Sequence, residues 1–366
     1  MTRTWLAQIV AVIRLELKKT FFAKRGLWIY LLALMPLALF VAHAVNVGYR
    51  NGVRERLAAH NQKPLTYQDL ASISTGMSRE EVIQRLGKPP SAYSWDEQRQ
   101  DESGPARLVV HETYNYTDGT SELHIRLEDG TVTGTELGQS ENLGESTVIF
   151  AGVFQFFYLR LAIFFGCLGI FMNLFRGELL DKSLHFYFLA PIRRDVLMVA
   201  KYLAGLLAAT VIFVTSEALQ FMALCWSFDP NLRNSYLYHG HGFAHLAAYL
   251  GITALAAIGY GSLFLAAGLW VRNPILPAAA ILIWEALNPF LPSVLQKISV
   301  IYYLKSLCPV EIPAAPGTPP LFALLISSPE PIPAPVAILG VILVSIAILF
   351  VSSRRVRRME INYTTE

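Results

Sequence analysis

Two carboxylates within apolar stretches, Glu217 and Glu285, and a group of three histidines are the residues whose types and spacing could support chemistry. A charged side chain at the centre of a membrane costs a few kcal/mol unless it is paired or hydrated. Each carboxylate therefore either lines a substrate path or a subunit interface, or is protonated or paired with a neighbouring Tyr, Ser or Trp. His241 and His245 lie one helical turn apart near His239 and could share a metal ion. Unligated imidazoles are commoner at a membrane interface, so we predict no metal site.

Motifs for nucleotide binding and for the commonest hydrolytic reactions do not occur in the sequence. The string nearest to Gly-x-x-x-x-Gly-Lys-Ser/Thr, Arg85 to Pro89, lacks the first glycine and the hydroxyl residue. His-Glu-x-x-His and Gly-x-Ser-x-Gly are also absent. We therefore predict that the chain is not an enzyme and has no catalytic or cofactor-binding residues. Any ATP and Mg²⁺ that it uses would be bound by a partner subunit.

The composition is that of a membrane protein with one separate acidic block. Of the 366 residues, 54% are hydrophobic and 16% are charged, whereas a soluble domain has about a quarter charged residues. Residues 46–147 contain ten Lys or Arg and sixteen Asp or Glu, a net charge of −6. The rest of the chain contains twenty and eleven, a net charge of +9. We expect the acidic block to lie across the membrane from the basic loops.

Apolar runs and basic residues together predict six spans with both ends of the chain in the cytoplasm. An apolar run of about 20 residues crosses a bilayer as a helix, and cytoplasmic loops carry an excess of Lys and Arg. The predicted spans are 27–45, 148–175, 196–228, 243–271, 275–290 and 334–351. The predicted cytoplasmic segments, each with Lys or Arg, are 1–26, 176–195, 272–273 and 352–366. The outer loop 229–242 has only Arg233, and a long Pro-rich outer loop occupies 291–333.

The first predicted span has a competing interpretation as a signal peptide. Residues 42–44, Ala-His-Ala, have the small-x-small form of a cleavage site. The long charged leader and the bulky apolar run favour an uncleaved span over 27–45.

Residues 1–26 combine an apolar helical face with basic side chains. Apolar residues at positions 6, 9, 10, 13, 17 and 21 recur every three or four positions. The basic residues are Arg14, Lys18, Lys19, Lys24 and Arg25. This pattern predicts a helix in the membrane interface, where Lys and Arg reach anionic lipid headgroups.

The acidic block, 46–147, predicts a small α+β domain. Ser78 followed by Glu81 forms a capping box for a helix over 79–86, after a short helix over 65–73. Residues 122–128 alternate between polar and apolar, and Asp-Gly pairs at 118–119 and 129–130 indicate hairpins. We expect two helices against a three-stranded antiparallel sheet.

Within this block, the string from Ile73 to Pro90 resembles the SmpA/OmlA (BamE-like) family. The shared features are Gly-Met-Ser, Glu-Val and Leu-Gly-x-Pro, followed by a strand meander, and the resemblance covers roughly residues 65–137. The resemblance implies the fold and a preference for protein or lipid contacts outside the cytoplasm. The chain has no lipobox cysteine here, so the family's role in the outer membrane is not carried over.

The charged segment between the second and third spans, 176–195, resembles the coupling loop of ABC-2 type permeases. Its pattern is an acidic residue, a short polar helix, Leu-x-x-Pro-Ile-x-Arg and a Lys-Tyr-Leu entry to the next span. The resemblance implies that this loop docks on a separate ATPase and that 1–26 is the elbow helix beside it. The coupling residues would be Glu178, Asp181, Lys182, Pro191, Arg193, Arg194 and Lys201. We expect Glu178, Asp181 and Lys182 at the surface and Lys201 extending to the membrane surface.

Together these patterns predict a six-span permease of the ABC-2 (type V exporter) fold in the bacterial inner membrane. The acidic domain 46–147 would be periplasmic and could bind a further protein there. Its partners would be a cytoplasmic ATPase dimer, a second permease copy or paralogue, and membrane lipids, with no nucleic acid. The predicted function is export of a lipid, glycan, peptide or drug-like substrate. The alternatives are a membrane-anchored scaffold for envelope assembly and, third, an intramembrane enzyme.

Overall fold

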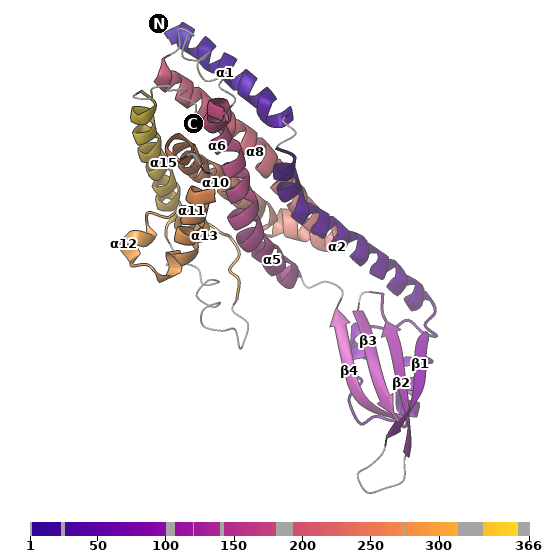
Figure 1. The fold of residues 1–366 in the computed structure, drawn as a ribbon. Helices are drawn as coiled ribbons and strands as arrows, with labels where there is room; N and C mark the ends of the chain where they lie inside the picture. The colour runs from indigo at the N-terminus through magenta and orange to yellow at the C-terminus, as the bar shows by residue number, and fades with distance from the viewer. Residues whose placement is uncertain are drawn as a thin grey trace. The chain divides into compact units, whose positions relative to one another are not determined.

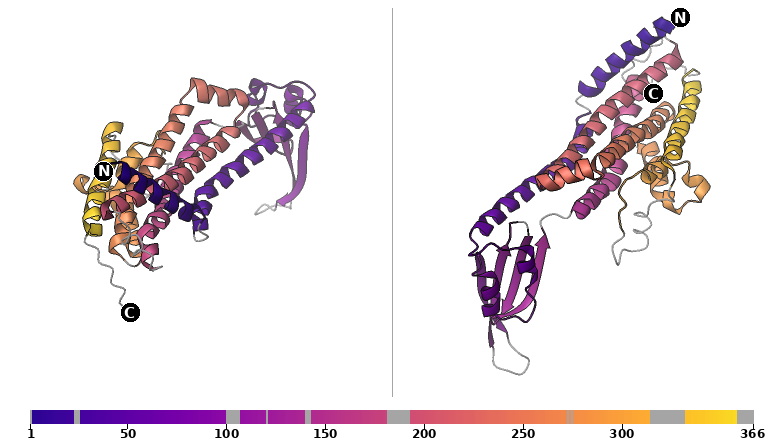
Figure 2. Two further views of the ribbon diagram at one scale, coloured as in Figure 1. Left: turned by 90° about the horizontal axis from the view of Figure 1, so that it is seen from above. Right: turned by 180° about the vertical axis from the view of Figure 1, so that it is seen from behind.

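The computed structural model describes residues 2–22, 26–99, 107–119, 121–139, 143–180, 193–271, 273, 275–313 and 332–357. The chain forms two compact units (Figures 1 and 2). One unit, called the helical unit here, comprises residues 1–41 and 147–366. The other, called the sheet unit, comprises residues 42–146.

The helical unit is built from long apolar helices and several short ones. The long elements are α1 (Thr2–Phe22), α2 (Leu27–Ala59), α5 (Leu143–Gly152), the π-helix η2 (Val153–Ile163), α6 (Phe164–Leu180), α8 (Arg194–Trp226), α10 (Gly242–Trp270) and α15 (Ala334–Arg357). The short ones are α9 (Pro230–Asn234), η3 (Ser235–His239), α11 (Ile275–Leu287), η4 (Asn288–Phe290), α12 (Ser293–Gln296) and α13 (Val300–Ser306). The last residues of α2 belong to the sheet unit.

Among the described residues, five helices are long and apolar enough to cross a membrane. They are Leu27–Ala59, Leu143–Glu178, Arg194–Trp226, Gly242–Trp270 and Ala334–Arg357. The predicted fifth span, 275–290, forms a shorter apolar helix. Its 16 residues extend about 24 Å, less than the ~30 Å of a bilayer core. The chain is therefore a membrane protein with five candidate spans, and the count of six stays a prediction.

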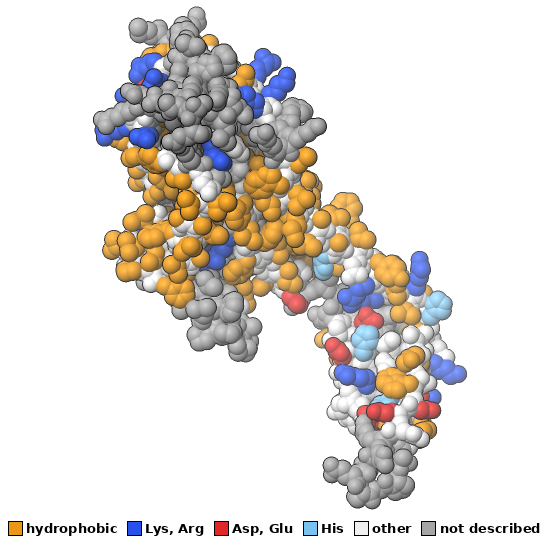
Figure 3. Space-filling model, in the orientation of Figure 1, with side chains coloured by type: hydrophobic (Ala, Val, Ile, Leu, Met, Phe, Trp, Pro, Cys, Tyr) orange, Lys and Arg blue, Asp and Glu red, His pale blue; other side chains and the backbone are white. Residues whose placement is uncertain are grey.

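Helix α10 lies at the centre of the helical unit, packed against α6, α8 and α15. A Cβ on Gly261 would lie 2.5 Å from the Phe171 ring, so glycine is needed for α6 and α10 to approach this closely. Gly251, on the same helix, has nothing within 4 Å of an added Cβ. Apolar side chains cover the outside of the unit, and basic ones gather toward the end with both termini (Figure 3).

The sheet unit contains a four-stranded antiparallel meander with the order β1-β2-β3-β4. The strands are β1 (Ser91–Arg99), β2 (Arg107–Thr117), β3 (Ser121–Glu128) and β4 (Thr131–Gln139). Helices α3 (Tyr67–Ala71) and α4 (Arg79–Leu86) contribute to one core with the inward face of the sheet. That core contains Leu65, Leu70, Ile73, Val82, Leu86, Tyr114, Tyr116, Leu123, Ile125, Leu127 and Val132. The predicted capping box between Ser78 and Glu81 is confirmed.

The prediction of three strands was wrong, because β1 is a fourth strand. Its large apolar residues, Tyr93 and Trp95, are exposed, so they do not alternate with buried positions of the core. The acidic pair Asp96 and Glu97 follows directly and interrupts any apolar pattern. Pairing with β2 forms this strand, with Trp95 opposite His111.

Candidate functional site

Four charged side chains from three helices meet inside the helical unit, and we call them the charged cluster. They are Glu16 and Lys19 of α1, Glu178 of α6 and Lys201 of α8. The Lys201 Nζ lies 2.6 Å from Glu16 Oε1 and 2.8 Å from Glu178 Oε2. It also donates a hydrogen bond to the Leu174 carbonyl oxygen at 2.9 Å. Lys201 is completely buried, so these acceptors replace its hydration.

Lys19 completes the cluster from its solvent side. Its Nζ lies 3.0 Å from Glu178 Oε1 and 3.9 Å from Glu16 Oε1, and its side chain is half exposed. Two ammonium groups thus balance two carboxylates. Burial raises the pKa of the Glu16 carboxyl, while Lys201 acts to lower it. Removing one partner of such a buried pair typically costs about 3–5 kcal/mol, because a charge is left uncompensated.

Packing of α6 against α8 positions the cluster. A Cβ on Gly205 would lie 2.9 Å from both the Phe171 ring and Leu174 Cδ1. Glycine at this position therefore lets the two helices approach closely, one turn from Lys201. The Lys201 ammonium also lies 5.5 Å from the centre of the Phe175 ring, within cation–π range.

Helix α1 docks on α8 through a face that shares Ile9 with the predicted apolar face and adds Val12. Ile9 and Val12 pack against Leu197 and Ala200. One turn further on, Glu16 continues the same face into the charged cluster. The apolar residues at positions 6 and 10 remain exposed, which leaves them for lipid. Of the predicted basic residues, Arg14 and Lys18 are exposed, while Lys24 and Arg25 lie outside the described residues.

The start of α8 is also fastened to α1 and to the end of α15. Arg193 pairs with Asp195 at 2.9 Å and lies over the Trp5 ring at 5.2 Å. Arg194 donates to the Arg357 carbonyl oxygen at 3.1 Å, and the Arg357 guanidinium pairs with Asp195 at 3.1 Å. Sequence reasoning found Arg193 and Arg194 but missed Asp195, whose partner Arg357 is 162 residues away.

Two sequence expectations about the coupling segment were wrong. Glu178, expected at the surface, is 6% exposed, and Lys201, expected to extend to the membrane surface, is completely buried. The physical reason is their mutual charge, since each neutralises the other in the helix interface. Asp181, Lys182 and Pro191 lie outside the described residues.

Glu285 is a buried carboxylate with every oxygen engaged. It accepts hydrogen bonds from the Ser299 hydroxyl at 2.6 Å, the Val300 N–H at 3.1 Å and the Ile301 N–H at 2.9 Å. The two N–H groups belong to the first turn of α13, where a negative charge is favourable. Of the two roles open from the sequence, the contacts match pairing with a neighbouring Ser, and Glu285 joins α11 to α13.

Glu217, in contrast, has no hydrogen-bond partner among the described residues at either carboxylate oxygen. It is completely buried on α8. Two further buried oxygens on α10, the Tyr249 hydroxyl and Thr253 Oγ1, also lack a partner within the described part of the chain. Buried polar atoms without a partner are rare in native proteins, so this group stands out.

The three histidines lie in η3 and at the start of α10. The His245 Nδ1 lies 2.9 Å from the Tyr236 hydroxyl, and the His241 and His245 rings stack at 6.0 Å. His239 is exposed. Within the described ranges, no group of three or more His, Cys, Asp or Glu residues could hold a metal ion.

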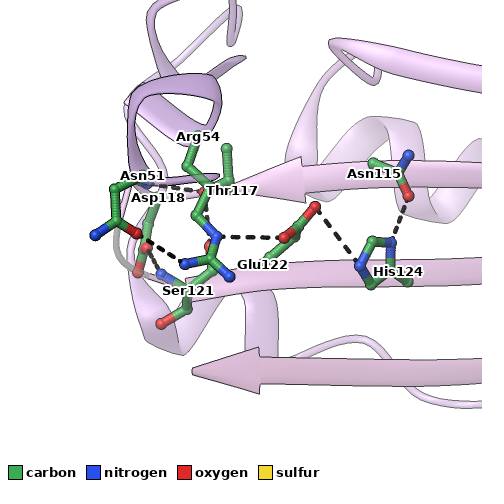
Figure 4. A network of polar contacts seen from close by, with 9 residues as sticks. Asn51, Arg54, Asn115, Thr117, Asp118, Ser121, Glu122 and His124 are labelled. Atoms are coloured by element: carbon green, nitrogen blue, oxygen red, sulfur yellow. Dashed lines mark hydrogen bonds and ion pairs between the residues drawn. The ribbon is translucent and has the colours of Figure 1, made fainter. Parts of the chain in front are cut away.

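A polar network in the sheet unit fastens the end of α2 to β3 (Figure 4). The Arg54 guanidinium is buried, donating to Glu122 Oε2 at 3.3 Å and to Asn51 Oδ1 at 3.1 Å. Glu122 in turn lies 3.5 Å from His124, whose Nδ1 contacts Asn115 Oδ1 at 2.6 Å.

The sheet unit also has an open groove of about 370 Å³. It is lined by Trp95, His111, Glu112, Arg126, Leu127, Glu128, Thr133 and Gly134. The Trp95 and His111 rings stack at 5.2 Å, and the His111 Nε2 lies 2.9 Å from Glu97 Oε2. An aromatic wall beside acidic and basic side chains is suited to binding a partner.

Comparison with protein-family models, with curated proteins and with solved structures finds no match to this chain. The sequence resemblances therefore enter only as support for a proposal.

Proposed function

We propose that the chain is the permease subunit of an ABC-2 type transporter. It would export a lipid, glycan, peptide or drug-like substrate with energy from ATP hydrolysed by a separate cytoplasmic ATPase. The observation that carries this proposal is the charged cluster. It joins the last turns of α6, the first turns of α8 and helix α1, and these helices flank the segment resembling a coupling loop.

This arrangement suits the transfer of motion from a docked partner to the spans. Glu178 precedes the segment 181–192, and Lys201 follows it. Because their side chains are linked to each other and to Glu16, a displacement of the segment would move α1, α6 and α8 together. Rigid-body movement of linked helices is a common route for coupling. The additional contacts of Arg193 and Arg194 with α1 and α15 would extend that linkage.

Several further features of the proposal rest on the sequence. The termini and the coupling segment would lie in the cytoplasm and the sheet unit in the periplasm of a bacterial inner membrane. A second permease copy or paralogue would complete the assembly. The first, basic helix would contact lipid headgroups and lie beside the ATPase.

Affinity purification in mild detergent tests the docking of an ATPase. Wild type is compared with the charge-reversed variant Asp181→Arg plus Lys182→Glu. Glu178 is left intact, because its substitution would break the buried cluster. The matched control is Arg126→Glu plus Glu136→Arg, which reverses an exposed pair in the sheet unit. We expect an ATPase to co-purify with wild type and with the control and to be lost from the coupling-segment variant.

A second candidate function is a scaffold that acts through the sheet unit. The groove beside Trp95 favours it, because an exposed aromatic wall with charged neighbours is a plausible protein-binding surface. In the same purification, the absence of any ATPase together with capture of envelope proteins would support the scaffold. Substitution of Trp95 by Ala should then release those proteins.

A further inference from the structure

The buried carboxylates of the helical unit differ in how their charge is compensated. Glu16 and Glu178 are paired with Lys201, and Glu285 accepts three hydrogen bonds. Glu217 is buried as completely as any of them, yet it has neither an ion pair nor a hydrogen bond among the described residues. A buried carboxyl without such a partner is either protonated or neutralised by an ion from outside the described polypeptide.

The polar side chains near Glu217 on its own side are already engaged. The Tyr158 hydroxyl of η2 donates to the Phe213 carbonyl oxygen at 2.6 Å. On α8, the Gln220 amide donates to Ser216 at 3.1 Å, and Ser216 donates to the Ala33 carbonyl oxygen. These groups form a closed set that offers Glu217 no positive charge.

The opposite side of Glu217 offers oxygens instead. Helix α10 packs against α8, and its Tyr249 ring lies 6.5 Å from the ring of Phe221, which follows Glu217 by one turn of α8. Thr253 follows one turn later, on the same face of α10 as Tyr249. Both hydroxyl oxygens are buried and without a partner in the described chain. Two carboxylate oxygens and two hydroxyl oxygens are thus available between α8 and α10.

We propose that Glu217, Tyr249 and Thr253 bind one small monovalent cation between α8 and α10. Carboxylate and hydroxyl oxygens are hard ligands, as alkali cations require. A single carboxylate balances a single positive charge, and within the described ranges Glu217 belongs to no group of three or more His, Cys, Asp or Glu residues that could hold a metal ion. The Phe154 and Phe150 rings pack on Tyr249, with their centres 4.7 Å and 5.1 Å from the centre of the Tyr249 ring. This packing leaves room only for a small ion. The cation would neutralise Glu217 and hold α8 against α10.

The adjoining π-helix supports a functional role for this region. Residues 153–163 form eleven residues of π-helix in the middle of a long apolar helix. Such segments are rare and are often found at functional sites. Phe154 and Tyr158 of this segment lie beside Tyr249 and α8, so η2 forms one wall of the proposed site.

The test measures Na⁺ binding to the purified full-length protein in detergent, and it does not require transport activity. Thermal unfolding is followed in NaCl and in choline chloride at equal ionic strength. We expect Na⁺ to raise the Tm of wild type by about 3 °C at ten times its dissociation constant. Binding of radioactive Na⁺ should approach one ion per chain.

Three variants and one control locate the ion. Glu217→Gln should lose the Na⁺-dependent shift and lower Na⁺ binding at least tenfold. Tyr249→Phe and Thr253→Val, which each remove one oxygen, should weaken Na⁺ binding several-fold. Tyr202→Phe is the control, because its hydroxyl is engaged with the Ile258 carbonyl oxygen at 3.0 Å. It should bind Na⁺ as wild type does.

Two results would overturn the proposal. If wild type unfolds at the same temperature in both salts and binds no Na⁺, the carboxyl carries a proton or a water contact instead. The same conclusion follows if Na⁺ binds equally to wild type and to Glu217→Gln. The wild-type measurement decides by itself whether Na⁺ binds. Failure of a variant to fold therefore does not change the conclusion. Neither result bears on whether an ATPase docks on the coupling segment.

Discussion

The charged cluster and the surroundings of Glu217 are two polar regions on the same helix, α8. They differ in whether a buried charge is compensated by the chain. In the cluster, every buried charge meets an opposite charge from another helix, as Lys201 does with Glu16 and Glu178. Four helical turns further along α8, Glu217 has neither an ion pair nor a hydrogen bond among the described residues. Burial alone therefore does not separate a structural carboxylate from a binding one. What separates them is whether the chain supplies the compensation itself.

The first prediction concerns the charged cluster, where the chain itself compensates the buried charges. Lys201→Met should leave Glu16 and Glu178 buried without their ammonium and destabilise the protein by about 3–5 kcal/mol. Chemical unfolding of the detergent-purified protein measures the loss. Adding Glu16→Gln and Glu178→Gln to this variant should restore much of the stability, because the one remaining charge of the cluster, on Lys19, is half exposed and can be hydrated. Lack of any restoration would mean that Lys201 acts by packing and not by charge.

The second prediction compares Glu285 with Glu217. Glu285→Ala leaves two N–H groups of α13 without their acceptor, at a cost of about 2–3 kcal/mol. Glu217→Gln removes no hydrogen bond of the described chain and should be neutral or stabilising in choline chloride. Thermal unfolding of both variants in that salt gives the comparison. Equal destabilisation would show that Glu217 has an internal role.

A third prediction extends the comparison to the sheet unit. Arg54→Leu should leave the Glu122 carboxylate with only His124 as a neighbour and cost about 1–3 kcal/mol. The double variant Arg54→Leu plus Glu122→Leu should cost less than the sum of the two single changes. Proteolysis across 46–65 and intact mass measurement would follow the loosening of α2 from the sheet.

The smallest effect concerns an exposed carboxylate. Hydrogen bonds from the Thr66 hydroxyl and backbone N–H lower the pKa of Asp69 below its ordinary value of 3.8. A carboxyl with a lowered folded-state pKa contributes stability above about pH 4 and loses it as the pH falls through its folded-state pKa. Hydrogen exchange in α3 between pH 5 and pH 3 should therefore quicken in wild type more than in Asp69→Asn, after correction for intrinsic rates.

Local patterns predicted much of the fold. Apolar runs marked the five long helices, and the capping box at Ser78 marked the start of α4. Strand β1 was missed because Tyr93 and Trp95 are exposed, so its formation depends on pairing with β2 and not on a buried face. The segment 275–290 was predicted as a span and forms a shorter apolar helix, so this span stays a prediction.

The candidate site was predicted only as a set of residues, without its geometry. Glu178 and Lys201 were identified from their place in the coupling pattern, but their burial was not expected. Glu16 was not singled out at all, because a glutamate in a basic amphipathic helix has no distinguishing local signal. Its role follows from Lys201, which is 185 residues away in the chain.

By itself, the sequence determined which segments are apolar, where the helices of the sheet unit begin, and that one acidic block interrupts a basic chain. Those properties depend on periodicity, capping and charge, which neighbouring residues encode. Only the tertiary structure decided which buried charges are compensated. Glu285 accepts hydrogen bonds from Ser299 and from α13, and Lys201 pairs with two carboxylates on other helices. Glu217 has no such partner in the described part of the chain, because compensation depends on which helices pack together and not on the order of residues along any one of them.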